Sequence, residues 1–493
     1  MRTEFLEIQG LPTPRRVFTY LTLGPNHCSQ HATNGCEKVS TYIVDSSWWR
    51  YQSAQGDTVS AGSPLKVFRF SSAAREILEA LEKGDKLPAS ASTVITRLVA
   101  AGAIHPKLTP TQQVALHATD VTVVIPAHNE SVDHLAALVT SLGGVGKIII
   151  VDDGSTPPIA NIEGAQLIRR EACGGPAAAR NTALAAVTSE IVFFLDADVS
   201  LSMMQRPWAD LLFHFDDPLI GLVAPRVASQ QGPSILQRYE EAESPLDLGE
   251  EPARVRQGTR VSYVPSAAMM VRTALVREHH GFDETLRFGE DVDLVWRLSN
   301  AGVICRYEPS VIVHHAPRQS FAQAWRQRVS YGSAATQLDA LHPGAVAPLR
   351  INRWSALAWG ALGFGHPVIA VCIATGSTGA LYQKIAGHKD SPSLALHLAG
   401  KGNIYAGRTI ASAMTRSWWP LTVLAVLFLR RSRRAVVAAI ILPSLWSWWK
   451  KKPKVDPLTY CTLRLADDVA YGTGVWKGVI ARRNIGALKP RFD

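Results

Sequence analysis

Glu190-Ile-Val-Phe-Phe-Leu-Asp-Ala-Asp198 joins a run of five apolar residues to two aspartates that are separated by one alanine. An unbroken apolar run of this length predicts a buried strand of a sheet. Residues i and i+2 of an extended segment lie on the same side, so Asp196 and Asp198 are expected to point the same way. Hard divalent cations prefer carboxylate oxygens and keep positions open for substrate phosphates. The stretch therefore predicts a metal site at a strand end, although a solvated loop or a helix cap would contain the same residues.

Three shorter apolar runs upstream also end at polar or glycine-rich residues. They are Val121-Thr-Val-Val-Ile-Pro126 before Ala127-His-Asn-Glu130, Lys147-Ile-Ile-Ile-Val151 before Asp152-Asp-Gly-Ser155, and Gln166-Leu-Ile168 before Gly174-Gly-Pro176. Strands of about five residues that alternate with helical stretches predict βαβ units and a parallel sheet. Ligands of such sheets bind beyond the carboxyl ends of the strands. Because the acidic and glycine-rich residues fall at those ends, we expect one binding site there.

A second acidic group, Gly289-Glu-Asp-Val-Asp293, opens a predicted helix that continues to Leu298. Acidic residues complement the dipole at a helix N-terminus, so capping alone would explain them. Downstream, Gln323-Ala-Trp-Arg-Gln-Arg328 predicts an amphipathic helix with Arg326 or Arg328 available to a phosphate.

Six short motifs follow one another along residues 119–340. They are Val123-Val-Ile-Pro-Ala-His-Asn-Glu130, Val151-Asp-Asp-Gly-Ser155, Ala179-Arg-Asn181, Asp196-Ala-Asp198, Gly281-Phe-Asp283 and Gly289-Glu-Asp-Val-Asp293. In this order they resemble the motifs of inverting GT-A glycosyltransferases of family 2. Three further stretches are similar to those of the glycosyltransferases of the mycofactocin system: Gly174-Gly-Pro-Ala-Ala-Ala-Arg-Asn181, Val261-Ser-Tyr-Val-Pro-Ser-Ala-Ala268 and Leu465-Ala-Asp-Asp-Val-Ala-Tyr-Gly-Thr-Gly-Val-Trp476.

The resemblance implies an α/β fold with a GT-A (nucleotide-diphospho-sugar transferase) domain, an N-terminal winged-helix-like domain and a C-terminal helical apolar region. The three domains would span residues 1–108, 119–340 and 341–493. The implied reaction is the inverting transfer of a hexose, glucose from UDP-glucose, in β linkage onto a mycofactocin-type, peptide-derived redox cofactor. A membrane-associated transferase for a cell-envelope glycan or lipid acceptor is the alternative. A non-catalytic scaffold that kept the fold is disfavoured, because the acidic residues are intact.

The same resemblance implies a divalent metal cofactor, Mg²⁺ or Mn²⁺. Asp198 would bind it, and Asp196 would contact the metal, a metal-bound water or the ribose of the donor. His314 and His315 follow the predicted strand Val311-Ile-Val313, and His314 is the one expected to join the metal or the diphosphate. A buried histidine without such a role would occupy the same place.

The resemblance also implies how the nucleotide sugar is held and which group removes the acceptor proton. The residues expected around the nucleotide sugar are Pro126, Asn129, Glu130, Asp152, Asp153, Arg180 and Asp196. Arg180 has two interpretations, since its guanidinium can pair with a phosphate or with a neighbouring carboxylate. Asp291 is the expected general base, with Glu290 as the alternative, because a carboxylate with a slightly raised pKa can accept the hydroxyl proton.

Composition and cysteine usage limit the class of protein. The chain has 493 residues, enough for two or three domains, and a formal net charge of +10. Its six cysteines form no CxxC pair, so no disulfide framework or zinc ribbon is predicted, and reduced thiols favour the cytosol. Cys28 and Cys36, with His27 and His31 nearby, would form either a small metal site or an irregular loop. Residues 1–20 lack the apolar core of a signal peptide.

The N-terminal part predicts a strand over Leu65–Phe70, a helix from Ala73 to Leu81 and a second helix from Ser90 to Ala101, ended by Gly102. This order is similar to the PqqD-like peptide-recognition domains of peptide-modifying pathways, which implies a precursor peptide as partner. A purely structural role is the alternative. DNA binding is not expected, because the second helix offers only Arg97 as a basic residue, and no nucleic-acid partner is predicted.

The C-terminal part combines apolar runs with positive charge. Residues 354–374 are long enough to cross a bilayer, whereas Trp418–Leu429 and Ala435–Trp449 are too short. Residues 416–454 hold nine Lys or Arg and no acidic residue, a pattern that favours an acidic membrane surface. We expect interfacial helices on the cytoplasmic side of the cell membrane, with at most one membrane-crossing segment. A buried helical subdomain is the alternative.

Overall fold

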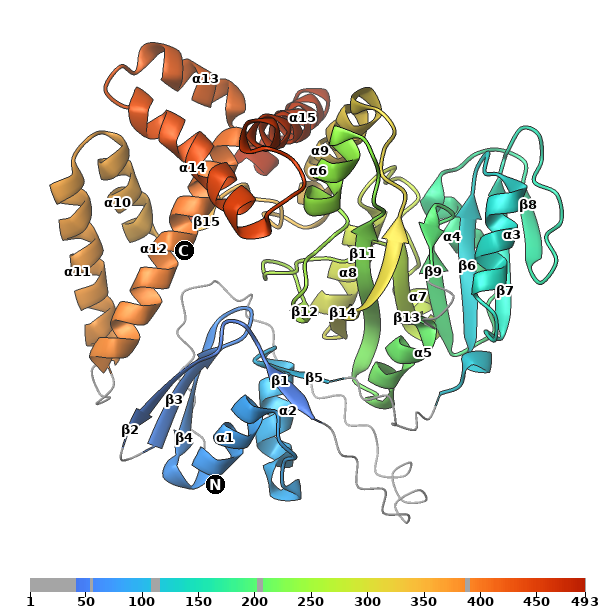
Figure 1. Cartoon of the computed structure of the whole chain (residues 1–493), viewed down its shortest axis with the longest axis horizontal. Coiled ribbons are helices and arrows are strands. Elements are labelled where there is room, and N and C mark those ends of the chain that lie inside the picture. Colours follow the sequence, from blue (N-terminus) through green and yellow to red (C-terminus); the bar gives the residue numbers. More distant parts are fainter. Residues whose placement is uncertain (1–40, 54–55, 108–115, 202–206, 386–390, 493) are drawn as a thin grey trace. The chain divides into compact units, whose positions relative to one another are not determined.

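The computed structural model describes residues 41–53, 56–107, 116–201, 207–385 and 391–492 (Figure 1). It divides into two compact units, one ending at Pro110 and one running from Thr111 to Phe492. The proposed metal site at Cys28 and Cys36 lies outside the described residues. The division between the units lies close to the predicted domain limit at residue 108. The three domains themselves stay predictions.

The N-terminal unit is built from five strands and two α-helices in its described part. They are β1 (Tyr42–Val44), β2 (Trp49–Ser53), β3 (Gly56–Ala61), β4 (Lys66–Ser71), α1 (Arg75–Lys83), α2 (Ser92–Ala100) and β5 (Ile104–Pro106). Strands β2, β3 and β4 form an antiparallel sheet, and β1 pairs with β5. Phe68 of β4, Leu78 of α1 and Leu98 of α2 share one core. The predicted strand and both helices are confirmed, whereas β1, β2, β3 and β5 were not predicted, and the winged-helix assignment stays a prediction.

The second unit contains a mixed sheet of nine strands in the described residues. They are β6 (Val121–Ala127), β7 (Lys147–Asp153), β8 (Gln166–Arg170), β9 (Ile191–Leu195), β10 (Val199–Ser200), β11 (Ile220–Ser229), β12 (Ala253–Val255), β13 (Ala268–Arg272) and β14 (Ile304–His315). Their order is β10-β14-β11-β13-β9-β6-β7-β8, with β12 beside β14. Strands β9, β6, β7 and β8 are parallel, as predicted, and β13 runs antiparallel to β9.

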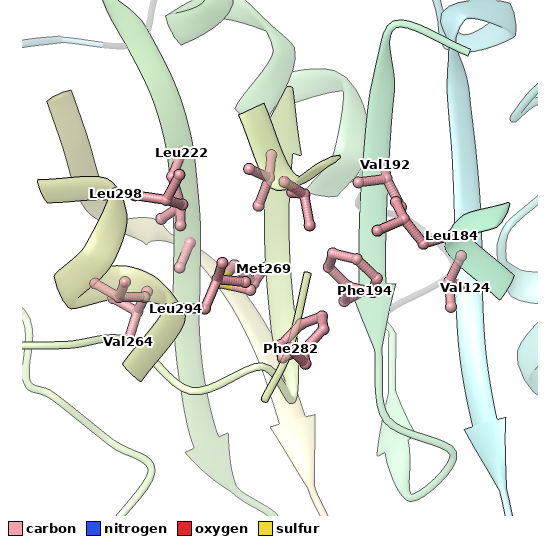
Figure 2. Packing of buried hydrophobic residues seen from close by; sticks show 14 of the residues in the cluster. Val124, Leu184, Val192, Phe194, Leu222, Val264, Met269, Phe282, Leu294 and Leu298 are labelled. Carbon is pink, nitrogen blue, oxygen red and sulfur yellow. The ribbon is translucent and has the colours of Figure 1, made fainter. Parts of the chain in front are cut away.

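Two helices, α4 (Pro176–Ala186) and α8 (Glu290–Asn300), cover the same face of this sheet. Figure 2 shows Phe194 of β9 and Met269 of β13 between Leu184 of α4 and Leu294 of α8. Phe194 also meets Phe282 edge to face, with ring centroids 5.0 Å apart. Because α4 and α8 share one apolar core, their polar residues at the carboxyl edge of the sheet come close together. The α/β fold class of this unit is confirmed.

Helices make up most of the chain after the sheet. The described ones are α9 (Phe321–Leu341), α10 (Arg353–Gly363), α11 (Pro367–Ile385), α12 (Ser391–Thr415), α13 (Trp419–Phe428), α14 (Arg433–Lys451) and α15 (Pro457–Arg482) (Figure 1). The predicted apolar run over residues 354–374 is divided between α10 and α11, because Gly365 takes a left-handed φ of 81° and Pro367 starts a new helix. Among the described helices, α11 alone is long and apolar enough to cross a membrane.

Candidate active site

A large cavity opens at the carboxyl ends of β6, β7 and β9. Its volume is about 1390 Å³, and its wall includes Asp196, Asp198, Glu290 and Asp291. The first two residues follow β9 directly, and the last two form the first turn of α8. The acidic residues that the sequence singled out in two separate stretches therefore face one space.

Asp198 and His315 form an ion pair on one side of this cavity. Strand β10 pairs antiparallel with the end of β14, so that Val199 lies opposite His315, and His315 Nε2 is 2.9 Å from Asp198 Oδ2. Burial acts to raise the pKa of Asp198, but the hydrogen bond and positive charge of His315 outweigh it and lower that pKa. Burial acts to lower the pKa of His315, and Asp198 more than offsets this and raises it.

His314, the histidine predicted for the metal or the diphosphate, does not line the cavity. It lies opposite Ser200 in the same register, and neighbouring side chains of a strand point to opposite faces. Of the two adjacent histidines, His315 therefore faces the cavity, and a histidine contact with the metal or the diphosphate stays a prediction. The register of β10 on β14 could not be derived from the sequence.

Arg180 connects the two acidic stretches. Its side chain is 2% exposed and donates hydrogen bonds to Asp196 Oδ1 at 2.6 Å and to Glu290 Oε1 at 2.9 Å. Its guanidinium also lies over the ring of Phe282, 5.3 Å from the centroid. Of the two interpretations of Arg180, the pair with neighbouring carboxylates is the one observed.

Glu290 and Asp291 begin α8 after Gly289, which has a left-handed φ of 81°. Burial raises the pKa of Glu290 to about 7, and the charge of Asp291 adds to this, against the opposing effect of Arg180. Burial also raises the pKa of Asp291, although its carboxylate accepts hydrogen bonds from the backbone N–H groups of Val292 at 2.7 Å and Ser266 at 3.2 Å. A carboxylate with a raised pKa facing a cavity has the property expected of a general base.

The carboxylates of Asp152 and Asp153, at the end of β7, are hydrogen-bonded to the backbone of neighbouring loops. Asp152 is fully buried, does not line the cavity and accepts hydrogen bonds from the N–H groups of Ser155 at 2.9 Å and Ile159 at 3.1 Å. Its carboxylate therefore does not line the cavity, where its contact with the nucleotide was predicted. Asp153 does line the cavity, and accepts hydrogen bonds from the N–H groups of Gly174 at 3.0 Å and Gly175 at 2.7 Å.

Of the predicted residues at the end of β6 and just after it, two line the cavity and one does not. Pro126 and Glu130 line the cavity, and burial raises the pKa of Glu130, with a further contribution from the charge of Asp198. Asn129 lies outside the lining and has a left-handed φ of 57°. Its Oδ1 accepts a hydrogen bond from the N–H of Thr156 at 2.9 Å, so it joins two loops instead of contacting the space directly.

Cations and aromatic side chains of the cavity were mostly not predicted. Arg318 lines the cavity, and its charge acts on both Glu130 and Asp198. Its position three residues after a histidine at a strand end was the only sequence signal available. Arg328, predicted to be available to a phosphate, is instead buried and paired with Glu240 at 3.3 Å, whereas Arg326 is exposed at the rim.

The described residues contain no ready-made group of three or more metal-binding side chains. Asp198 and His315 nevertheless supply one carboxylate and one imidazole on the cavity wall. Mg²⁺ and Mn²⁺ sites commonly use one or two protein carboxylates and complete their coordination with substrate phosphates. The donor set therefore fits a cation that is shared with a bound diphosphate.

A family model described as glycosyl transferase family 2 matches residues 122–277. The pre-mycofactocin glycosyltransferase of Mycobacterium tuberculosis, in two strains, is 39% identical over 461 residues, which cover 89% of this chain and 95% of that protein. Succinoglycan biosynthesis protein ExoU of Rhizobium meliloti is 29% identical over 216 residues, covering 40% of this chain and 60% of ExoU. A solved mannosyltransferase from Pyrobaculum calidifontis, in complex with GDP-Man and Mn²⁺, has a TM-score of 0.34 and 17% identity, and covers 60% of this chain and 91% of its own.

Proposed function

The chain belongs to the family of the pre-mycofactocin glycosyltransferases, and from this premise we propose that it transfers a hexose from a nucleotide sugar onto pre-mycofactocin. It is a glycosyltransferase with a GT-A-like fold. Glucose from UDP-glucose is the proposed donor sugar. The observation that carries the proposal is the single cavity at the strand ends, where Asp196, Asp198 and Asp291 meet.

Donor binding is proposed on the side of Asp198 and His315. These two residues would hold Mg²⁺ or Mn²⁺ together with the diphosphate, and Asp196 would lie near the ribose. When bound, the cation would neutralise the negative charge that develops on the leaving diphosphate. Arg318 is close enough to act on the pKa of Asp198, and we assign it to the same diphosphate. Pro126, Glu130 and Asp153 would border the nucleotide.

Asp291 is proposed as the general base. It accepts the proton of the acceptor hydroxyl while the hydroxyl oxygen bonds to the anomeric carbon and the bond from that carbon to the diphosphate breaks. One displacement inverts the anomeric centre, so an α-linked donor gives a β-linked product. Glu290 is bound to Arg180 and is therefore the weaker candidate. Arg180 is proposed to keep Asp196 and Glu290 in place rather than to contact the donor.

Two further partners are proposed for other parts of the chain. Exposed apolar side chains on α10, α11, α13 and α14, together with the basic residues of 416–454, support attachment to the cytoplasmic face of the cell membrane. The separate core of the N-terminal unit supports a role as a recognition module for the precursor peptide. Fluorescence titration of the full chain with that peptide tests the second role, and no saturable binding would contradict it.

A cell-envelope glycan or lipid is the second candidate acceptor. The similarity to a succinoglycan biosynthesis protein and the exposed apolar helices favour it. The two candidates are distinguished by which acceptor molecule gains the mass of a hexose. The protein is incubated with Mn²⁺, a panel of nucleotide sugars and either pre-mycofactocin or a membrane-lipid extract, and the products are analysed by mass spectrometry.

A hexose added to pre-mycofactocin from UDP-glucose is the expected result. Replacement of Asp291 by Asn should lower the rate of transfer by about 10²–10⁴-fold while UDP binding persists. Replacement of Asp198 by Asn should weaken binding of UDP with Mn²⁺ as well as transfer. Transfer that stays at the wild-type rate in the Asp291→Asn variant would contradict the assignment of the base.

A further inference from the structure

The stretch Leu465–Trp476, which the reaction described above does not use, lies in the middle of α15. Asp467, Asp468 and Tyr471 of this stretch line the same cavity as Asp291. Helix α15 reaches the cavity because it packs closely along α9: a Cβ atom on Gly474 would lie 2.0 Å from the carbonyl oxygen of Val329. The C-terminal helices therefore complete the wall of the active site.

The polar groups on this wall are paired with one another. Asp467 accepts a hydrogen bond from the Tyr239 hydroxyl at 3.0 Å and lies 3.5 Å from Arg328. Asp468 accepts a hydrogen bond from Thr415 Oγ1 at 2.6 Å and lies 3.9 Å from Arg416.

Arg464 completes the pairing, because its guanidinium donates to Glu243 at 3.1 Å. Each of these guanidinium groups thus has its own carboxylate partner, so the wall offers little unbalanced charge to a second diphosphate. The side chains of Asp467 and Asp468 nevertheless remain 23% and 20% exposed. Their carboxylate oxygens can still accept hydrogen bonds from a ligand.

Aromatic rings connect this wall to the proposed base. Tyr471 lies under Arg416, whose guanidinium is 4.1 Å from the ring centroid. Tyr263 is close enough to both Asp291 and Tyr471 for their charges to act on its pKa, which burial raises to about 12. Tyr331 lines the same space and meets Phe288 edge to face at 6.2 Å. Flat rings beside hydroxyl and carboxylate groups suit a ring-containing ligand that carries hydroxyl groups.

The cavity is larger than a typical pocket for one small molecule. Pockets for single small molecules measure roughly 300–1,000 Å³, whereas this cavity measures about 1390 Å³. Asp291 is close enough to Arg180 and Asp196 for their charges to act on its pKa, and its own charge acts on Tyr263 and Tyr331. All of these residues line the cavity, so an acceptor bound against the tyrosines would lie near the proposed base.

We propose that Asp467, Asp468 and Tyr471 of α15 form the acceptor subsite, and that it takes a neutral, ring-containing molecule with several hydroxyl groups. This inference rests on the proposed glycosyl transfer. The carboxylates would accept hydrogen bonds from acceptor hydroxyls, and the tyrosine rings would lie against its apolar faces. A site that hydrogen-bonds substrate hydroxyls rejects analogues that lack them, so α15 would determine which acceptor is used.

The test uses the full chain with Asp467→Asn and Tyr471→Leu. Asp339→Asn is the matched control, because Asp339 is a buried carboxylate of α9 outside the cavity that accepts a hydrogen bond from the Gly344 N–H at 2.9 Å. Calorimetry measures the affinity for UDP with Mn²⁺, and then for pre-mycofactocin in the presence of UDP. Transfer kinetics give the acceptor KM, and donor hydrolysis is followed without acceptor.

Both α15 variants should raise the acceptor KM and Kd at least tenfold. UDP affinity and donor hydrolysis should stay within about twofold, and the control should match the wild type in every measurement. The inference is overturned if acceptor affinity is unchanged, if UDP affinity falls equally, or if the wild type does not bind pre-mycofactocin. If pre-mycofactocin binds to the wild type but not to the α15 variants, and no donor gives a transfer product, the subsite is upheld. The proposed reaction is then the part that is contradicted.

Discussion

At the scale of single residues, the site depends on one buried cation between two carboxylates. Arg180 is 2% exposed, and Glu290, which accepts one of its hydrogen bonds, has a side chain that is 9% exposed. Two like charges in the same low-dielectric space would otherwise repel each other and lose solvation. Arg180 therefore stabilises the approach of α8 to the end of β9, where Asp196 lies.

Replacement of Arg180 by Met should lower the free energy of unfolding by about 3 kcal/mol and abolish transfer, because Glu290 then loses its cation in a buried position. Replacement by Lys should have a smaller effect on unfolding, since one ammonium group cannot reproduce the two-sided contact. Urea unfolding and initial-rate assays measure both effects. The control is Arg238→Met, on the exposed side of α6 (Ile235–Glu243), and an equal loss of stability there would contradict this account.

A second prediction concerns pH. Asp291 must be ionised to accept a proton, and burial raises the pKa of both Asp291 and Glu290, the latter to about 7. The rate should therefore begin to fall at a higher pH than for an ordinary carboxylate, whose pKa is about 4. The two groups titrate as a coupled pair, so Glu290→Gln should shift the acid limb of kcat/KM to lower pH. An acid limb that does not move would exclude this coupling.

At this scale the sequence predicted which residues lie at the site better than it predicted their hydrogen-bond partners. The apolar run before Asp196 fixed the end of a strand, and Asp196, Asp198 and Asp291 do line one cavity. The bond between Arg180 and Glu290 joins residues 110 positions apart, for which spacing gives no signal. The sequence could not decide between His314 and His315, because a shift of one residue in register reverses which side chain faces the site.

At the scale of elements, close packing between α9 and α15 brings the C-terminal helices to the cavity. Glycines allow this approach: a Cβ on Gly332 of α9 would lie 1.9 Å from the carbonyl oxygen of Tyr471 in α15. On another side of α15, a Cβ on Gly472 would lie 1.7 Å from the carbonyl oxygen of Arg416, which follows α12. The motif around residues 470–476 thus has a physical role in packing. Its glycines are spaced so that the helix backbones meet.

Replacement of Gly474 by Ala should destabilise the protein by about 1–3 kcal/mol, because the two helices must move apart. Alanine alone would favour the helix by about 1 kcal/mol, so a net loss identifies packing as the cause. Gly400→Ala in α12 is the control, since a Cβ there meets no atom within 4 Å, and it should leave stability equal or higher. Thermal unfolding distinguishes the two, and equal shifts in Tm would argue against close packing.

The N-terminal sheet contains a comparable buried charge. Asp57 of β3 has a fully buried side chain and receives hydrogen bonds from Arg50 Nε at 2.9 Å and Arg75 Nη2 at 2.9 Å. Asp57→Asn should destabilise this unit by about 3–5 kcal/mol, because both guanidinium groups lose their carboxylate. Hydrogen exchange should show faster exchange in β2 to β4 and unchanged exchange in β6 and β9. Equal acceleration in both units would contradict their separate cores.

Elements with a strong local signal were predicted well. Strands β6, β7 and β9 follow from short apolar runs, and α8 follows from the acidic residues after Gly289. The antiparallel strand β13 and the mixed order of the sheet depend on long-range pairing that no local pattern contains. The apolar run over residues 354–374 forms two helices instead of one, and hydropathy alone does not register the left-handed Gly365 that divides it.

At the scale of the whole molecule, most of the exposed apolar surface of the second unit lies on the helices that follow the sheet. Large apolar side chains there that are at least half exposed include Trp354, Leu357, Phe364, Val368, Ile369, Val371, Leu421, Leu424, Leu427, Phe428, Leu442, Trp446 and Trp449. Exposed apolar side chains in such numbers indicate an interaction surface rather than a solvated one. Basic residues at the junction of α13 and α14 would add attraction for anionic lipid headgroups.

The protein should therefore sediment with vesicles that contain phosphatidylserine, and less with vesicles of phosphatidylcholine alone. Changing Arg430, Arg431 and Arg434 to Gln should weaken this binding by about 1 kcal/mol for each charge removed. The same change at Lys66, Lys83 and Arg97, exposed in the N-terminal unit, is the charge-matched control and should have little effect. Equal losses in the two triple variants would show that net charge, and not its location, drives the binding.

Extraction of the vesicle-bound protein then distinguishes attachment from insertion. At a salt concentration near 1 M the Debye length falls to about 3 Å, so a protein held at the surface by its basic residues should be released. Because α11 is the described helix that meets the length and hydropathy of a membrane span, Val371→Lys in α11 should abolish membrane binding if that helix crosses the bilayer, and weaken it only partly if the helix lies at the surface. Release by salt and a partly weakened Val371→Lys variant are the results that we expect. A fraction that only detergent releases, and that disappears in this variant, would show that α11 is inserted.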